Sequence, residues 1–484
     1  MPVIVTINQP AQLLKRRQLS LSTVLSPFAE ALETSVVDVT KLRVTFDWVQ
    51  YAHAFREAFS ARALLSEDGA PLGGRGELAV DLRQVDPSLF LDQFNQAVRC
   101  LAEPAADESR LYLEEFRPGV DSIIWTFNLF FWQHLEDWES VFIKDFTEAL
   151  PGGGSDGTNP AYVHDQVGAF IGRLNDMAAH HLVPDEIFVL EMGVGNGLQS
   201  KRWMDEFRDQ SAAGGQDYYK RLRYLMSDFS QHVLDHARKA VREHDDKISL
   251  IPVNALDPES ALGFLRYKVL YVHLCNTYDN LPCTEIARLE ERFYEVQVRA
   301  YLPSATSAAI CETFSLQPAR LREEIDRLLK IGPDYLHDMQ TGVRFWSDVW
   351  DGLRLEERYV PIPDMAGYPI ADRVTGEEVV DMLSNYGGDI RFHLSNGAVK
   401  SFVHTIPLLH PKGMLEVQDV FTTRLDQYRQ GFRGPGKYDG SLMNQINGPL
   451  LRQVAGRHGF NVEFAPFKYR KGSATTILST TMKE

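Results

Sequence analysis

The sequence predicts an α/β protein built on a parallel, doubly wound sheet. Between 185 and 283, short apolar runs alternate with amphipathic helical stretches, which is the pattern of strands joined by crossover helices. The run 267–276 is apolar at nearly every position, as expected of a strand that is covered on both faces. A further strand pattern, 412–421, comes late in the chain. We therefore expect one sheet whose two parts are separated in the sequence.

Four segments follow from these patterns. Apolar residues three and four apart predict a helical N-terminal region over 1–180. The α/β core is expected over 185–283 and 391–484. Between its two parts, 284–390 is predicted to be a mainly helical insertion, too long for a plain loop, that caps one edge of the sheet.

Composition and charge exclude several classes of partner. The net charge of −16 disfavours binding to nucleic acid in general. The most apolar stretch, 122–132, is too short to cross a membrane and is expected to be a buried helix. The four cysteines form no CxxC pair, so a zinc cluster is not expected, and their scarcity suits a reducing compartment. With no apolar secretory leader at the N-terminus, we expect a cytoplasmic protein with no metal.

Three glycines directly follow the first predicted strand of the sheet. They are Gly193, Gly195 and Gly197, and the acid Glu191 precedes them. Ligands of open α/β sheets bind at the carboxyl ends of the strands, and glycine lets the backbone approach a ligand closely. The dinucleotide fingerprint is GxGxxG, whereas the spacing here is GxGxG. The alternative is a tight turn between a strand and a helix.

An acid followed by GxGxG resembles motif I of the class I methyltransferases, which use S-adenosyl-L-methionine. This resemblance implies a Rossmann-like methyltransferase sheet. Asp228 ends the second strand, where a carboxylate can accept both hydroxyls of a ribose; the alternative is a helix-capping acid. The resemblance also implies cofactor contacts for Glu191 and for further residues at the strand ends. These are Phe229, Asn254, Ala255 and Asn276.

Over roughly 185–484 the chain is similar in more detail to the MidA-like methyltransferases. Glu191 and the three glycines match the E-x-G-x-G-x-G pattern of that family. Asn276, Asp279 and Pro282 match its N-E-x-x-D-x-x-P segment, but Thr277 stands in place of the glutamate. Asp419 matches the acid of a later strand. The resemblance implies the fold and the cofactor, and the change at Thr277 argues against arginine as the acceptor.

Methyl transfer to a hydroxyl or a protonated amine needs a base. The candidates at the carboxyl edge are Asp279, which we favour, Tyr278 and Asp419. Tyr278 can equally be a packing residue. His273 lies within an apolar run, where a histidine is more often a satisfied core residue.

Two polar segments are candidates for binding the acceptor. The loop 149–163 is rich in Gly, Ser, Asp and Pro and suits an active-site lid, although a domain linker is as good an interpretation. The second segment, 433–449, follows the fifth strand of the predicted sheet, where acceptors usually contact this fold. The candidate acceptor-binding residues are Ser155, Asp156, Asn159, Tyr438 and Asn444.

The favoured function is a methyltransferase enzyme that uses S-adenosyl-L-methionine and acts on a small molecule or a protein side chain. The alternative is a binding or assembly protein that keeps the fold without turnover. A nicotinamide-dependent oxidoreductase is disfavoured by the glycine spacing. We expect no nucleic acid or membrane partner, and the N-terminal region is a possible homodimer surface.

Overall fold

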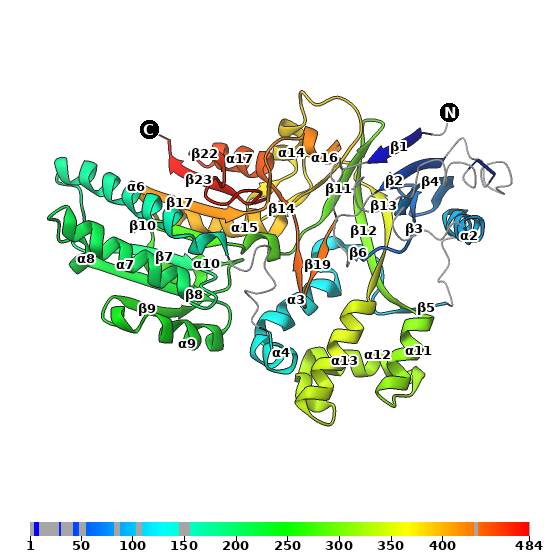
Figure 1. Cartoon of the computed structure of the whole chain (residues 1–484). Coiled ribbons are helices and arrows are strands. Elements are labelled where there is room, and N and C mark those ends of the chain that lie inside the picture. Colours follow the sequence, from blue (N-terminus) through cyan, green and yellow to red (C-terminus); the bar gives the residue numbers. More distant parts are fainter. Residues whose placement is uncertain are drawn as a thin grey trace.

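The architecture comes from a computed structural model of the 484-residue chain. The structure describes residues 4–8, 29–30, 42–47, 55–81, 88–102, 109–144, 155–429 and 434–483. Figure 1 shows two sheets side by side, with helices between and below them.

The first sheet has seven strands within the described residues, in the order β22-β23-β17-β10-β7-β8-β9. Counted along the chain from β7, this order is 6-7-5-4-1-2-3. All neighbours pair in parallel except β23, which runs antiparallel to both β17 and β22. The strands are β7 (Ile187–Met192), β8 (Leu222–Asp228), β9 (Ile248–Pro252), β10 (Val269–Cys275), β17 (Leu409–Asp419), β22 (Phe460–Pro466) and β23 (Thr476–Met482). The predicted Rossmann-like sheet is confirmed.

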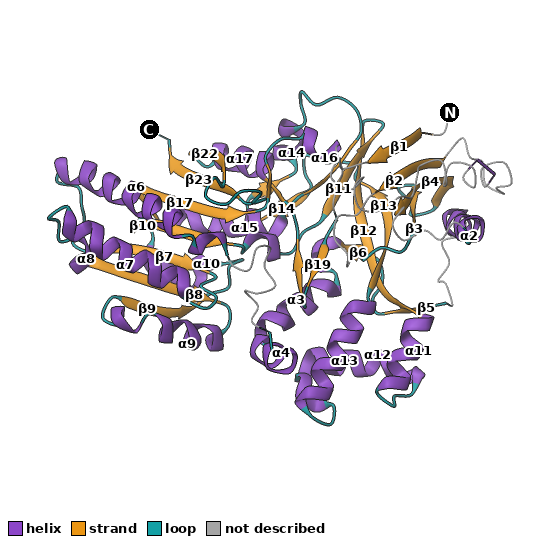
Figure 2. Cartoon of the chain, viewed as in Figure 1, coloured by secondary structure: helices purple, strands orange, loops and turns teal. Residues whose placement is uncertain are grey.

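Helices cover both faces of this sheet, as Figure 2 shows. Three of them pack on one face: α6 (Pro160–Ala179), α7 (Leu198–Ala213) and α9 (Gln231–Ala240). Another three pack on the opposite face: α10 (Pro258–Leu262), α15 (Asn396–Thr405) and α17 (Gly448–Arg457). Two-sided cover explains why β10 is buried at six of its seven positions and apolar throughout most of its length.

A second, ten-stranded mixed sheet joins the N-terminal part of the chain to the insertion. Its main path is β1-β2-β4-β3-β13-β12-β11-β16, and β5 and β6 pair with β12. Its N-terminal strands are β1 (Ile4–Asn8), β2 (Leu42–Asp47), β3 (Phe59–Leu65), β4 (Pro71–Asp81), β5 (Arg110–Tyr112) and β6 (Arg117–Pro118). The others are β11 (Glu285–Leu289), β12 (Arg292–Pro303), β13 (Arg354–Pro361) and β16 (Ile390–His393).

The prediction of helical structure over 1–180 and 284–390 is therefore wrong in part. In the N-terminal region α2 (Phe90–Ala102) is a helix, but β2, β3 and β4 are strands. In the insertion, the hairpin of β11 and β12 replaces a predicted helix. Alternate residues of β12 from Tyr294 to Leu302 are apolar, which is a strand period. The charged residues Arg292, Glu295 and Arg299 are three and four residues apart, a spacing that imitates the polar face of a helix.

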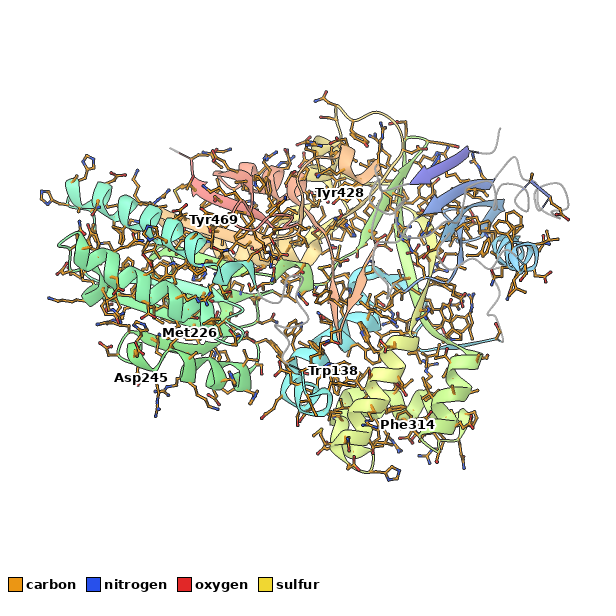
Figure 3. All side chains as sticks on the ribbon, viewed as in Figure 1. Trp138, Met226, Asp245, Phe314, Tyr428 and Tyr469 are labelled. Atoms are coloured by element: carbon orange, nitrogen blue, oxygen red, sulfur yellow. The ribbon has the colours of Figure 1, made fainter. Side chains whose placement is uncertain are left out.

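Five further helices of the described residues pack beneath the second sheet. They are α3 (Ile123–Gln133), α4 (Leu135–Phe142), α11 (Ser304–Thr313), α12 (Leu321–Ile331) and α13 (Met339–Gly352). The apolar run 122–132 is confirmed as a buried helix, α3, which begins at the N-cap Ser122. Figure 3 labels Trp138 of α4 in this region, and its ring centroid lies 4.5 Å from that of Trp346 in α13. No helix among the described residues is long and apolar enough to cross a membrane.

Buried charges tie the strands of the second sheet together. Glu357 of β13 pairs with Arg62 of β3 and with Arg391 of β16, and all three side chains are largely buried. Arg391 also pairs with Glu285 of β11. The neighbouring guanidinium groups hold the pKa of Glu357 well below its usual range against the opposing effect of burial. The cluster therefore links strands that are far apart in the sequence.

Replacing Glu357 with Gln should destabilise the protein strongly, because Arg62 and Arg391 would keep buried charges without this partner. We expect the free energy of unfolding to fall by about 3–5 kcal/mol in urea denaturation. The control is Glu290→Gln, which removes an exposed partner of Arg75 and should cost less than about 1 kcal/mol. Equal losses in the two variants would contradict this account of the cluster.

Candidate active site

The carboxyl ends of β7, β8, β9 and β10 meet at one edge of the first sheet, because these strands run parallel and adjacent. The glycine turn leaves β7 at this edge and leads into α7. Gly193, Gly195 and Gly197 all have positive φ, at 78°, 52° and 76°. Each lies in the left-handed region that favours glycine.

The three glycines differ in the space that a side chain would have at each position. A Cβ on Gly193 would lie 2.6 Å from Oγ1 of Thr277, and one on Gly197 would lie 2.7 Å from the backbone oxygen of Ala237 in α9. A Cβ on Gly195 would meet nothing within 4 Å. Gly193 and Gly197 are thus needed for packing, whereas Gly195 faces open space at the carboxyl edge.

Asp228 ends β8 beside this turn. One of its oxygens accepts a hydrogen bond from the backbone N–H of Ser230, at 3.1 Å. Burial raises the pKa of Asp228 to about 6, and backbone N–H groups, including that of Gly195, oppose the rise. Ser230, not Asp228, caps α9, because its hydroxyl accepts from Val233 N–H. The helix-capping alternative for Asp228 is therefore not supported.

Other predicted cofactor residues lie at neighbouring strand ends. Phe229, next to Asp228, is a large apolar side chain that is 42% exposed. Asn254 is exposed after β9, and its side-chain oxygen accepts from Leu256 N–H at 3.0 Å. Ala255 follows it and is half-buried. Asn276, after β10, has a positive φ of 48°. The structure brings these residues to the same edge as Gly195.

The side chain of Glu191 is buried between strands and helix α7, away from the other predicted cofactor residues. It is 2% exposed, and its Oε2 accepts from the hydroxyls of Ser200 at 2.6 Å and Tyr224 at 2.5 Å. Burial raises its pKa to about 7, against the effect of these hydrogen bonds. Since Ser200 is in α7, the carboxyl group is turned toward the helical cover, and it holds α7 to the strands.

His273 belongs to the same buried group. Its Nε2 lies 2.8 Å from the Tyr224 hydroxyl and its Nδ1 lies 3.4 Å from the side-chain nitrogen of Gln199. Burial lowers the pKa of His273 to about 3, so the ring is neutral. The interpretation of His273 as a satisfied core residue is confirmed.

Asp419 holds the turn that follows β10. Its Oδ2 accepts from the backbone N–H groups of Thr277 at 3.1 Å, Tyr278 at 2.9 Å and Asp279 at 3.3 Å. Its Oδ1 accepts from Val420 N–H at 2.8 Å. The side chain is fully buried. Asp419 therefore joins the end of β17 to the turn after β10.

The two other catalytic candidates, Tyr278 and Asp279, are buried in this turn. Burial raises the pKa of Asp279 well above its usual range, and the charge of Asp419 raises it further. Burial raises the pKa of Asp419 as well, to about 7, but four backbone N–H groups oppose this rise and favour its charged form. We therefore expect Asp279 to be the protonated member of the pair. Tyr278 is 2% exposed within an apolar cluster. The raised pKa of Asp279 opposes its action as a general base near neutral pH, and the burial of Tyr278 fits a packing role.

The described part of the predicted lid is held by hydrogen bonds and an ion pair. Residues 145–154 lie outside the described residues. The hydroxyl of Ser155 lies 3.1 Å from Sγ of Cys275, at the end of β10. Asp156 is buried, pairs with Arg470 at 2.9 Å and accepts from Ser473 at 2.5 Å. Asn159 caps α6. Only Ser155 of these three reaches the strand ends.

The second acceptor segment approaches the turn after β10 through Asn444. Its backbone N–H donates to the carbonyl of Asp279 at 2.9 Å, and its side chain is buried. Tyr438 is half-buried in the short strand β19 (Gly436–Tyr438), whose partner is β20 (Ser441–Met443). Asn444 is therefore beside Asp279, whereas Tyr438 lies within the β19–β20 hairpin.

Sequence reasoning missed the part that α3 plays at this edge. Asn128 donates from Nδ2 to the carbonyl of Asn280 at 2.9 Å, and Trp132 donates from its ring nitrogen to Oδ1 of Asn280 at 3.2 Å. Asn128 also accepts from Leu442 N–H at 2.8 Å. The signal available was a polar residue, Asn128, within an otherwise apolar helix, since a buried amide needs partners.

No family model and no curated protein matches the chain. Solved structures similar to it include a proposed methyl transferase from Burkholderia thailandensis bound to S-adenosyl-homocysteine, at 11% identity and a TM-score of 0.43. That match covers 76% of this chain and 88% of the other. The CcbJ methyltransferase from Streptomyces caelestis is 13% identical with a TM-score of 0.32, over 71% of this chain and 96% of the other. The assignment of the fold rests on the strand order described above.

Alanine at Gly197 should destabilise the protein more than alanine at Gly195. Both changes place a side chain at positive φ, which costs about 1–2 kcal/mol. Gly197→Ala adds a collision with the backbone of α9, for about 1–3 kcal/mol more. Thermal unfolding of the two variants checks this order, and a larger loss for Gly195→Ala would contradict it.

Glu191 should make the protein less stable as the pH rises. Its pKa of about 7 in the folded state exceeds its ordinary value of 4.5, so the folded state binds more protons between these pH values. Stability should fall through this window, by up to about 3 kcal/mol for this group. Glu191→Gln should reduce the slope by the contribution of this group when unfolding is measured from pH 4.5 to 8, while Asp228 and Asp279, whose pKa values are also raised, maintain the rest. The control Glu186→Gln changes an exposed acid and should keep the slope; parallel curves for Glu191→Gln and the wild type would refute the assignment.

Proposed function

We propose that the protein is a methyltransferase that uses S-adenosyl-L-methionine. The observation that carries the proposal is the juxtaposition of Gly195, which faces open space, with the carboxylate of Asp228 at the adjacent strand end. The exposed ring of Phe229 lies next to them. This edge offers a carboxylate for a vicinal diol and an apolar surface for a flat ring, which are the groups of an adenosine.

The glycine turn is poorly suited to a dinucleotide. A pyrophosphate on a Rossmann sheet rests on free N–H groups at the start of the first helix. Here the side-chain oxygen of Asn196 already accepts from Leu198 N–H, at 3.1 Å. The antiparallel β23, which lies between β17 and β22, is a further departure from the 3-2-1-4-5-6 order of dinucleotide sheets.

When bound, S-adenosyl-L-methionine supplies a methyl group already activated on a sulfonium. The protein's own contribution is to orient the cofactor and the acceptor and to exclude water. Asp228 would bind the ribose and Gly195 would let the cofactor approach the backbone. Thr277, packed over Gly193, closes the turn toward β10. The turn 277–280, held by Asp419 and by Asn128 and Trp132 of α3, would form the wall that faces the acceptor.

The acceptor is proposed to be a small molecule or a protein side chain. Because Asp279 is expected to be protonated, an acceptor that reacts in its neutral form fits the site better than one whose proton must be removed by this residue. Asp279 could instead donate a hydrogen bond to such an acceptor.

A second candidate function is a cofactor-binding protein without turnover. The observation that favours it is that Tyr278, Asp279 and Asp419 are all buried and that the carboxylate of Asp419 is occupied by backbone N–H groups. Formation of S-adenosyl-homocysteine in the presence of candidate acceptors, followed by mass spectrometry, separates the two candidates.

Calorimetric titration with S-adenosyl-homocysteine tests the cofactor site. We expect micromolar or tighter binding, about −8 kcal/mol or better. Asp228→Ala should weaken it by about 1–3 kcal/mol because the ribose hydrogen bonds are lost. Asp235→Ala removes an exposed acid from α9 and serves as the control, with unchanged affinity expected. Absence of binding by the wild type, or equal affinity in Asp228→Ala, would refute the assigned site.

A further inference from the structure

One cavity lies away from the carboxyl edge of the first sheet, on the second sheet. Its volume is about 590 Å³, within the range of cavities that hold small organic molecules. Strands β3, β12 and β13 and helix α2 contribute to its walls, and Arg110 of β5 lies at one end. N-terminal and insertion residues therefore build it together.

Small side chains make the cavity possible. Ala63 of β3 pairs in register with Arg358 of β13, and Ala61 lies two residues earlier on the same face of the strand. Methyl groups leave space beside the long side chains of Arg358 and Glu356. The rest of the apolar lining includes Phe59, Leu65 and Leu355, so part of the cavity suits an uncharged organic body.

Most charges in the cavity wall are paired. Glu356 accepts from Arg299 at 2.6 Å and pairs with Arg110, which also binds Glu57 at 3.0 Å. The positive charges of Arg110 and Arg299 are therefore balanced by the negative charges of Glu57 and Glu356. Arg299 is further held above the ring of Tyr112, with its guanidinium carbon 3.7 Å from the ring centroid. These groups are rigid parts of the wall.

Arg358 differs from the other two arginines. It forms no ion pair with any residue in the described ranges, and its Nε and one terminal nitrogen donate to Oε1 of Gln297 at 3.0 and 2.7 Å. Its guanidinium lies 4.4 Å from the centroid of the Phe116 ring, which Arg299 also contacts at 4.4 Å. Burial and the charge of Arg299 lower the pKa of Arg358, while Glu115, which also lines the cavity, and Glu295 raise it.

A fixed guanidinium without a paired carboxylate, at the wall of a cavity, is suited to bind an anion. Gln297 uses two of its donors and sets its orientation, and the remaining N–H groups can serve a carboxylate or a phosphate. We propose that this cavity is a second ligand site, which binds a small organic anion whose carboxylate or phosphate contacts Arg358 and whose apolar body lies over Ala61 and Ala63. The site is separate from the proposed cofactor site and does not depend on that proposal.

The test uses phenyl phosphate and benzoate as probes and benzamide as the neutral control, with saturation-transfer NMR on the full chain. We expect at least one of the two anions to bind, benzamide to bind at least tenfold more weakly, and excess S-adenosyl-homocysteine to leave the anion's signal unchanged. Binding of no anion by the wild type, or equal binding of benzamide, would overturn the proposal. Displacement by S-adenosyl-homocysteine would also overturn it, since it would place the probe at the first sheet.

Two variants locate the bound probe. Arg358→Gln should weaken anion binding at least tenfold, and Ala61→Phe should abolish it by filling the cavity. The matched control is Arg223→Gln, which removes the same charge from an exposed position on β8 and should change nothing. Thermal unfolding of each variant verifies folding, and Arg358→Lys, which keeps the charge, should retain part of the affinity if Arg358→Gln proves unstable. Wild-type affinity in Ala61→Phe, or in a folded Arg358→Gln, would contradict the proposal.

Discussion

The candidate site depends on one carboxylate, that of Asp419. This buried group accepts hydrogen bonds from four backbone N–H groups, three of them in the turn after β10. An unsatisfied buried N–H costs about 1–3 kcal/mol, so loss of this group would leave the turn without its main support. Through the turn, Asp419 places Thr277 against Gly193 and Asn280 against α3. The glycine turn, the carboxyl ends of β10 and β17, and helix α3 meet at this turn.

The candidate site at the first sheet therefore also depends on a helix that packs beneath the second sheet. Helix α3, which packs beneath the second sheet, supplies Asn128 and Trp132 to the turn at the edge of the first sheet. The β19–β20 hairpin lies against the same helix, since a Cβ on Gly440 would lie 2.3 Å from the ring of Phe131. The proposed acceptor wall thus comes from parts of the chain that are separated by more than a hundred residues, and the charged cluster around Glu357 helps to hold the sheet behind it.

The sequence predicted the first sheet well because local pattern and tertiary environment agree there. Strand β10 is almost continuously apolar since helices cover both of its faces. GxGxG follows β7 because all three glycines have positive φ and because Gly193 and Gly197 leave no room for a Cβ. The second sheet was missed where the local pattern and the tertiary environment disagree. In β12, Arg292, Glu295 and Arg299 have the spacing of a helix face although apolar residues alternate between Tyr294 and Leu302. Strand β3 finds its partner β13 almost three hundred residues away, which no local pattern indicates. At the site, the edge residues Gly195 and Asp228 were predicted from spacing. The directions of side chains were not: Glu191 turns to α7, and Asp156 is used in an ion pair.

The central claim is that an adenosine-containing cofactor binds between Gly195 and Asp228. A crystal structure of the protein grown with S-adenosyl-homocysteine tests it most directly. The account predicts that the ribose hydroxyls contact the carboxylate of Asp228 and that the ligand passes over Gly195 near Phe229. Ligand density elsewhere on the molecule, with this edge closed by protein side chains, would contradict it.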